Sequence, residues 1–389
     1  MRKFITIVIF LVSIVSGIHG QSSKMVMGAE QPEKYLSLIQ NKKVALVVNH
    51  TSLVGKVHLV DFLEDKKIDI EKIFASEHGF RGDASAGAEI ANGIDPKSSI
   101  PVISLYGETR KPTREQLQNV DIVIFDIQDV GCRFYTYIST LHLVMEACAE
   151  NNVPLIVFDR PNPNGDYVAG PVRKTGFESF VGMDPIALVH GCTVGELAKM
   201  INGEGWLGTK DKCELTVIPV LNYTHSTKYE LPVKPSPNLP NYTSVRLYPS
   251  LCFFEATSVS IGRGTEFPFQ LIGGLDSTLG KFQFTPVSIP GVADHPLNEG
   301  KVCYGVDLRS LTTIPKFTLK YFLDFWQKYD YKSAFLTQRN WFNLLAGTDE
   351  LLKWIEDGKT EKEIFTFLEP ELKKYKTIRK KYLLYTDFE

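Results

Sequence analysis

The sequence carries almost no excess of either charge. Its 389 residues include 43 lysines and arginines and 45 aspartates and glutamates, which gives a formal net charge of -2. It also lacks a block of basic residues interleaved with aromatic ones, which argues against nucleic acid as a partner. The rest of the composition, 43% hydrophobic and 23% charged, is typical of a globular protein. A chain of 389 residues predicts two domains.

Nucleotide and nucleophile fingerprints are missing where an α/β fold would carry them. Residues 43–50, the first predicted strand, are not followed by G-x-G-x-x-G, and no G-x-x-x-x-G-K-[ST] occurs in the chain. Without those glycines a backbone cannot approach a phosphate closely. G-x-S-x-G is also absent, which disfavours a serine hydrolase. We therefore expect no cofactor.

Cysteines are few and dispersed, with no C-x-x-C pair and no histidine at ligand spacing. This pattern does not support a zinc site, and we expect no metal. Most of the cysteines are expected to be small buried side chains. The alternative is one or two disulfides, which the oxidising environment of an exported protein permits. The six are Cys132, Cys148, Cys192, Cys213, Cys252 and Cys303.

Only the N-terminus combines a long hydrophobic run with basic flanking residues. Arg2 and Lys3 precede an apolar stretch at residues 4–18, and small residues follow up to Gly20. This order is typical of a secretory signal peptide, so we expect residues 1–20 to be cleaved off near Gly20. The alternative is an uncleaved membrane anchor, but the run is short for a span of ~20 residues. We expect an exported protein, periplasmic or extracellular, without a stable membrane anchor.

The first half of the chain alternates short runs rich in Val and Ile with helix-like segments. Near-continuous apolar strands between amphipathic helices predict a parallel sheet covered on both faces. We therefore expect an α/β fold: a Rossmann-like, doubly wound, mainly parallel domain over residues 24–250, then a smaller α+β domain over 251–389. The predicted strands are residues 43–50, 70–77, 100–107, 120–129 and 153–161, and the clearest helices are 57–65 and 136–150.

The pattern loosens after Pro171. Thr193 and Glu196 have the spacing of a capping box at a helix start, which favours a structural role for Glu196. Residues 234–242, K-P-S-P-N-L-P-N-Y, hold prolines that exclude helix and central strand. This segment is predicted to be a stiff loop that links the domains or borders a pocket.

Polar residues cluster where the predicted strands end. In open α/β sheets ligands bind beyond the carboxyl ends of the strands, so we expect a site at this edge. The alternative is that each residue merely caps a helix or forms a turn. The residues are Asn49, His50, Glu77, His78, Tyr106, Asp126, Asp129, Asp159 and Arg160. Carboxylates with neutral hydrogen-bonding groups and aromatic rings suit hydrolysis of a hydroxyl-rich substrate such as a sugar, although these residue types alone do not demand it.

A set of motifs in this order resembles the NamZ/YbbC family of exo-β-N-acetylmuramidases, formerly a domain of unknown function. The resemblance runs from about Gly28 to the C-terminus. The one departure is Ala256, where the family pattern has glycine. The motifs are S-E-H-G-F-R-G at 76–82, F-D-I-Q-D-V-G-C-R-F-Y-T-Y at 125–137, D-R-P-N-P-N-G at 159–165, G-P-V at 170–172, H-G-C-T-V-G-E-L-A at 190–198 and F-E-A-T-S-V-S-I-G-R-G-T-E at 254–266.

The resemblance implies a Rossmann-like domain joined to a smaller C-terminal domain, with the active site in the cleft between them. It implies a glycoside hydrolase that releases terminal β-1,4-linked N-acetylmuramic acid from the non-reducing ends of peptidoglycan fragments. With it, we expect Glu77 to be the general acid/base and His78 to tune it or bind substrate. The second carboxyl group is left open between Asp126 and Asp129. Without the resemblance, Glu77 is equally a solvated loop carboxylate.

Muramic acid carries a lactyl carboxylate, which an arginine fork is suited to bind. Arg81, Arg133, Arg160 and Arg263 lie in the motifs, and each has a structural ion pair as its alternative. Tyr135 and Tyr137 are expected to form a sugar-stacking wall, although aromatic residues just before a helix are also common in cores. The other expected substrate-binding residues are Asn49, Asp159, Asn162, Asn164, His190, Glu255, Ser258 and Glu266.

Two other classes of protein remain as alternatives. One is a non-catalytic peptidoglycan- or glycan-binding protein, against which the joint presence of Glu77, Asp126 and Asp129 argues. The other is an α/β hydrolase of esters or amides, disfavoured because no nucleophile elbow occurs.

Overall fold

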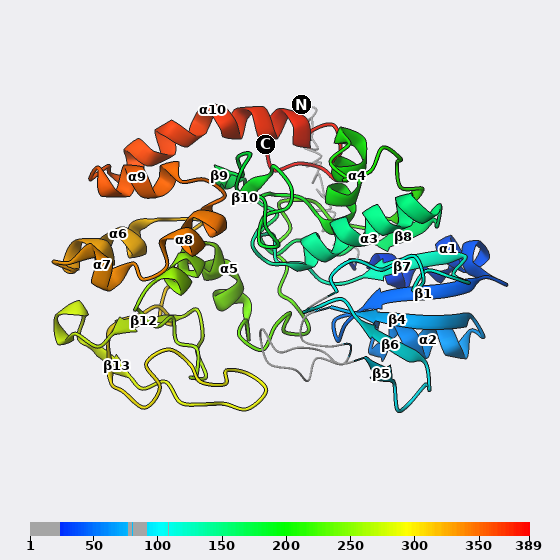
Figure 1. Ribbon diagram of the computed structural model, residues 1–389, viewed down its shortest axis with the longest axis horizontal. Coiled ribbons are helices and arrows are strands. Elements are labelled where there is room, and N and C mark those ends of the chain that lie inside the picture. Colours follow the sequence, from blue (N-terminus) through cyan, green and yellow to red (C-terminus); the bar gives the residue numbers. More distant parts are fainter. Residues whose placement is uncertain (1–23, 77–79, 81–91, 108) are drawn as a thin grey trace, which may run out of the picture.

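A seven-stranded sheet organises the N-terminal part of the protein, on the right of Figure 1. The computed structural model describes residues 24–76, 80, 92–107 and 109–389, so the expected signal peptide lies outside the described residues. Every pair of strands is parallel except the last, β5–β6. In spatial order the strands are β11 (Leu215–Ile218), β8 (Leu155–Phe158), β7 (Ile122–Asp126), β1 (Lys43–Val48), β4 (Asp69–Ala75), β6 (Pro101–Ser104) and β5 (Gly93–Ile94).

Both faces of this sheet are buried, as its apolar strands predict. Along β1, Val44, Leu46 and Val48 belong to one apolar cluster, whereas Ala45 and Val47 belong to another. The first cluster includes the buried faces of α1 and α2, and the second includes those of α3 and α4. Alternate side chains of a strand point to opposite faces, so this division places helices on both sides. The four helices are α1 (Pro32–Ile39), α2 (Leu59–Asp65), α3 (Tyr137–Asn151) and α4 (Val194–Glu204).

Short elements complete the N-terminal part. The capping box at the start of α4 is confirmed, because the Thr193 hydroxyl accepts from Glu196 N and the Glu196 carboxylate accepts from Thr193 N. The remaining elements are η1 (Gly28–Glu30), the two-stranded sheet of β2 (Leu53–Val54) and β3 (Val57–His58), and the antiparallel pair β9 (Ala169–Val172) and β10 (Ala187–Val189).

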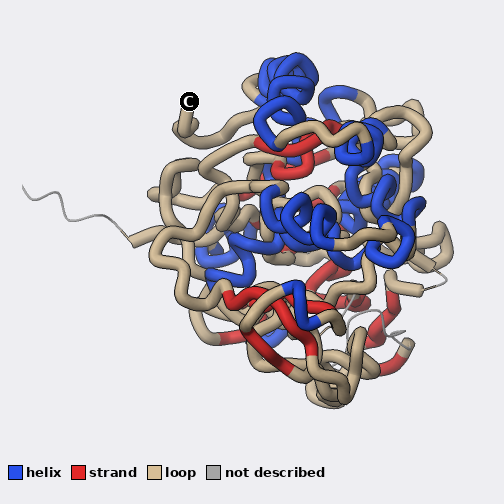
Figure 2. The backbone as a smooth tube through the Cα atoms, turned by 90° about the vertical axis from the view of Figure 1, so that its left-hand side faces the viewer, coloured by secondary structure: helices blue, strands red, loops and turns tan. Residues whose placement is uncertain are grey.

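The C-terminal part is smaller and mixes helices with an antiparallel sheet in the order β12-β14-β13. In the view turned by 90° the strands of this sheet lie below most of the helices (Figure 2). The predicted α/β fold, with a smaller α+β region after a mainly parallel sheet, is therefore confirmed. Its elements are α5 (Tyr242–Leu251), η2 (Cys252–Ala256), β12 (Leu271–Gly274), η3 (Ser277–Leu279), β13 (Phe282–Phe284), β14 (Cys303–Asp307), α6 (Lys320–Lys328), α7 (Lys332–Phe335), α8 (Arg339–Ala346), α9 (Glu350–Glu356) and α10 (Glu361–Arg379).

The end of the chain returns to the Rossmann-like part. Helix α10 crosses the top of Figure 1 from the side of α9 toward α4. Arg379 donates to Gly191 O over 2.7 and 2.9 Å, and Leu384 N donates to Glu196 Oε1 over 2.8 Å. The apolar cluster on the α3 face also continues into α5, α6 and α8. These contacts join the two parts through a shared core.

The cysteines are all buried and free. Across the described ranges, no group of three or more His, Cys, Asp and Glu side chains is placed to hold a metal ion. Within the same ranges, no helix has both the length and the apolar character that a membrane span needs.

Candidate active site

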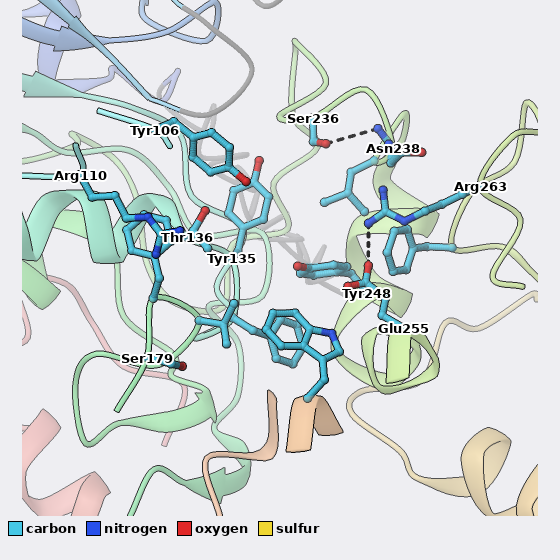
Figure 3. A pocket seen from close by; sticks show the side chains of 16 residues that line it. Tyr106, Arg110, Tyr135, Thr136, Ser179, Ser236, Asn238, Tyr248, Glu255 and Arg263 are labelled. Carbon is cyan, nitrogen blue, oxygen red and sulfur yellow. Dashed lines mark hydrogen bonds and ion pairs between the residues drawn. The ribbon is translucent and has the colours of Figure 1, made fainter. Parts of the chain in front are cut away.

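A cavity of about 390 Å³ lies between the two parts of the protein (Figure 3). The N-terminal part contributes the segment after β6, the segment that enters α3 and the loop between β9 and β10. The C-terminal part contributes α5, η2, the loop before β12, and α8. The lining residues are Tyr106, Arg110, Phe134, Tyr135, Thr136, Ser179, Phe180, Val181, Ser236, Asn238, Leu239, Tyr248, Glu255, Arg263, Phe269 and Trp341.

Glu255 and Arg263 form an ion pair on one side of this cavity. Arg263 Nη2 lies 2.6 Å from Glu255 Oε1, and the guanidinium also lies over the Phe269 ring. Burial opposes the charge of Arg263, but the Glu255 carboxylate outweighs it and raises the pKa of the arginine. The flanking Gly262 and Gly264 have φ of 80° and 78°, a region that side chains with a Cβ disfavour. The Gly-Arg-Gly turn therefore requires its glycines to present Arg263.

Tyr106 and Tyr135 are two further predicted residues that line the cavity. The hydroxyl of Tyr135 donates to Pro235 O over 2.8 Å, which joins the start of α3 to the proline-rich loop. That loop borders the cavity through Ser236, Asn238 and Leu239. Of the two predicted roles, linking the domains or bordering a pocket, the structure shows the second. Tyr137 packs edge-on against Tyr135 at 4.9 Å and does not line the cavity. Tyr137 is therefore a buried core residue and does not form part of the expected sugar-stacking wall.

Asp126 and Arg160 were expected at the site, but the structure buries them against each other. Arg160 Nε donates to Asp126 Oδ1 over 2.6 Å, and Nη2 donates to Oδ2 over 2.8 Å. Asp126 is 0% exposed and Arg160 is 6% exposed. Neither lines the large cavity, so the geometry gives this pair a structural role. The ion-pair alternative for Arg160 accounts for its contacts.

The strand order reverses between β1 and β7, where open α/β sheets commonly bind ligands. In this protein the loops after these strands bond to each other: Asn49 Oδ1 accepts from Thr51 N over 2.9 Å, and Thr51 Oγ1 accepts from Gln128 N over 3.1 Å. Only about 80 Å³ of space remains there, lined in part by Thr51, Gln128 and Arg160. Asn49 is therefore part of a closed loop junction rather than of the large cavity.

Asp129 and His190 are also buried away from the cavity. Asp129 Oδ2 accepts from Gly131 N over 2.6 Å and lies 3.4 Å from His190 Nε2. His190 is 0% exposed. The pair supports the turn after β7, so the structure does not place either side chain where a substrate reaches it.

Asp159 ties three segments together. Its carboxylate accepts from Thr193 Oγ1 over 2.7 Å, from Gly195 N over 2.8 Å and from the Tyr385 hydroxyl over 2.5 Å. Burial raises the pKa of Asp159 to about 6, although the bonds from Tyr385 and Thr193 oppose that rise. The expected substrate-binding role is replaced by a junction between β8, the start of α4 and the C-terminal tail.

The other polar residues of the D-R-P-N-P-N-G motif are structural as well. Asn162 Nδ2 donates to Cys192 O over 2.8 Å, and Asn164 Nδ2 donates to Val130 O over 2.8 Å. Both asparagines are buried. Because their amides donate to loop carbonyls and neither side chain lines the cavity, they hold the surrounding turns.

The guanidinium of Arg133 binds backbone carbonyl groups rather than a ligand. It donates to Pro171 O, Ile186 O, Leu345 O and Ala346 O over 2.6 to 3.0 Å. The last two are carbonyls at the end of α8, which favour a cation. Burial lowers the pKa of Arg133. The expected contact with a lactyl carboxylate is replaced by a clamp between the two parts of the protein.

Of the remaining predicted residues, two lie away from the cavity and three lie outside the described residues. Ser258 donates to Ala334 O over 2.7 Å, and Glu266 is exposed; neither lines the cavity. Glu77, His78 and Arg81 lie outside the described residues.

Several cavity residues fall outside the motifs. Arg110, Phe180 and Trp341 line the cavity but belong to no motif. Tyr106 also belongs to no motif, but it stands at the end of a predicted strand. Trp341 is carried by α8, more than 200 residues after Tyr106. A local pattern cannot mark such residues, because exposed aromatic and basic side chains occur singly on any surface.

Comparisons with known proteins agree over most of the chain. Residues 44–243 match the model described as exo-β-N-acetylmuramidase NamZ, N-terminal, and residues 246–385 match its C-terminal counterpart. The peptidoglycan β-N-acetylmuramidase NamZ of Bacillus subtilis strain 168 is 38% identical over 374 residues, which is 90% of this chain and 89% of that protein.

Two crystal structures of DUF1343 family proteins from Bacteroides fragilis NCTC 9343 are similar to this fold. One has a TM-score of 0.87 at 44% identity and covers 94% of this chain and all of its own. The other has a TM-score of 0.81 at 27% identity, over 93% of this chain and 99% of its own.

Proposed function

The chain belongs to the NamZ family of exo-β-N-acetylmuramidases, and we propose that it releases N-acetylmuramic acid from the non-reducing ends of peptidoglycan fragments. It is a glycoside hydrolase of peptidoglycan that acts in cell-wall turnover.

The cavity between the two parts carries this proposal. Its volume of about 390 Å³ lies in the range of small-molecule sites, ~300–1,000 Å³, and suits one or two sugar rings. Tyr106, Tyr135, Tyr248 and Trp341 supply apolar ring surfaces together with polar edges. A sugar has the same combination of apolar ring faces and hydroxyl groups.

We propose Glu77 as the general acid and Glu255 as the second carboxylate. Glu77 follows Ala75, the last residue of β4, by two positions in the sequence. Asp126 and Asp129 are buried elsewhere, so among the described residues Glu255 is the carboxylate that lines the cavity. Arg263 holds Glu255 in place through their ion pair, and a positioned carboxylate suits an oxocarbenium-like transition state.

Hydrolysis of nitrophenyl β-glycosides tests the function. The N-acetylmuramic acid glycoside is expected to be cleaved with a kcat/KM at least ~10-fold above that of the N-acetylglucosamine glycoside, because a charge-assisted contact contributes roughly 1.5–3 kcal/mol. On a longer glycan ending in muramic acid, only the monosaccharide should be released. Binding without any release would favour a glycan-binding protein, and release of internal fragments would exclude an exo mode.

We also propose that the protein acts outside the cytoplasm after loss of residues 1–20. The basic start, apolar run and small residues of the N-terminus support export. Fractionation of the producing cells followed by N-terminal sequencing should give a protein that begins near residue 21. An intact N-terminus in the membrane fraction would overturn this proposal.

A further inference from the structure

Two guanidinium groups line the cavity in the described part of the chain, and they differ in their partners. Arg263 is neutralised by Glu255 at 2.6 Å. Arg110 forms no ion pair and no hydrogen bond with any described residue, and its side chain is exposed. Two arginines and one glutamate leave the described lining with one excess positive charge, which belongs to Arg110. In Figure 3 Arg110 and the Glu255–Arg263 pair lie on opposite sides of the cavity.

Arg110 is held by an aromatic face. Its guanidinium carbon lies 4.4 Å from the centre of the Phe180 ring, and both side chains line the cavity. Contact between a guanidinium and a ring face orients the plane of the fork and leaves its N–H groups available. Such a fork matches the two oxygens of a carboxylate.

Both segments that carry this contact are anchored to α3. Next to Arg110, Lys111 Nζ lies 2.6 Å from Glu146 Oε1 and 2.7 Å from Glu150 Oε2. Beyond Phe180, Asp184 Oδ1 lies 2.9 Å from His142 Nδ1. Because one helix fixes both sides, little ordering is needed when an anion binds, and preorganisation of this kind favours affinity.

We propose that Arg110 is a specificity-determining residue that binds the carboxylate of the lactyl ether, the group that distinguishes N-acetylmuramic acid from N-acetylglucosamine. This rests on the proposed function, since that function supplies the substrate. Arg110 recognises the substituent and takes no part in bond cleavage. Replacing Arg110 should therefore lower kcat/KM only for a substrate that carries the lactyl carboxylate.

The test compares two nitrophenyl muramic acid glycosides, one with the free lactyl carboxylate and one with that group as the primary amide. The wild-type protein should prefer the acid by about 10–150-fold in kcat/KM, which corresponds to ~1.5–3 kcal/mol at ~1.4 kcal/mol per decade. In Arg110→Gln, kcat/KM for the acid should fall by most of that factor, while the value for the amide stays within about twofold. Arg110→Lys, which keeps the charge but not the fork, should lie between the two.

Arg114→Gln is the matched control, because Arg114 is exposed on the same segment and does not line the cavity. It should retain the preference of the wild-type protein. An equal fall for the acid and the amide in Arg110→Gln, or no fall in either, would overturn the role of Arg110. If the wild-type protein cleaves both glycosides equally well, the proposed function stands and the carboxylate contact is excluded. If it cleaves neither, the proposed function fails and this proposal fails with it.

Discussion

Replacing Glu77 by glutamine is expected to lower kcat on a β-1,4-linked muramoyl disaccharide by ~10²–10⁴-fold, the usual contribution of general acid–base catalysis. Glutamine keeps the size and the hydrogen-bonding groups of the side chain but cannot transfer a proton to the leaving oxygen. Folding and binding of product should change little. Steady-state kinetics on the disaccharide, with the urea midpoint as a check on folding, measure the effect.

The nature of the leaving group separates this role from simple binding. A nitrophenol leaves with little protonation, so the loss caused by Glu77→Gln should shrink on a nitrophenyl glycoside compared with the disaccharide. Glu266→Gln is the matched control, because Glu266 is exposed and does not line the cavity. Near-native turnover of the disaccharide by Glu77→Gln would move the acid to Glu255, and an equal loss on both substrates would indicate a binding role.

Asp126→Asn is expected to lower the free energy of unfolding by ~3–5 kcal/mol, because the substitution leaves the buried Arg160 without its counter-charge. The two side chains are almost wholly inaccessible and share two hydrogen bonds. Urea denaturation should show a lower midpoint with an unchanged slope, the sign of a change in stability alone. Activity per folded molecule should stay near the wild-type value.

Two further variants sharpen this result. Asp211→Asn, on an exposed loop, removes the same charge without a buried partner and should leave the midpoint unchanged within ~0.5 kcal/mol. Combining Asp126→Asn with Arg160→Met removes the uncompensated cation and should recover part of the lost stability. A fully stable Asp126→Asn protein whose kcat falls more than about 100-fold would instead assign Asp126 to catalysis.

The fold could be predicted because its signals are local. Residues 44–48 of β1, Val-Ala-Leu-Val-Val, are all apolar and all buried, as a strand covered on both faces requires. Thr193 and Glu196 likewise mark the start of α4, because a capping box depends on residues three positions apart. Such patterns require no knowledge of the rest of the chain.

The site was only partly predictable, because a buried structural polar residue and a substrate-binding one have the same identity in a sequence. Asp126 finds its partner 34 positions away, and Arg133 finds carbonyl partners 212 and 213 positions away. No spacing rule reports contacts of this length. Glu255 and Arg263, two of the predicted residues that line the cavity, are only eight positions apart in the sequence.

The sequence by itself therefore determined the mainly parallel sheet, the helix start at Thr193 and the family, since each depends on short patterns or on their order along the chain. Only the tertiary structure decided which polar groups face the cavity. Packing between the two parts places Arg133 against carbonyl groups of both, and packing within the N-terminal part pairs Asp126 with Arg160. Packing within the N-terminal part also brings Arg110 onto Phe180, across the cavity from Glu255. An arginine without an intramolecular partner is available to a ligand. Whether an arginine has such a partner depends on long-range packing.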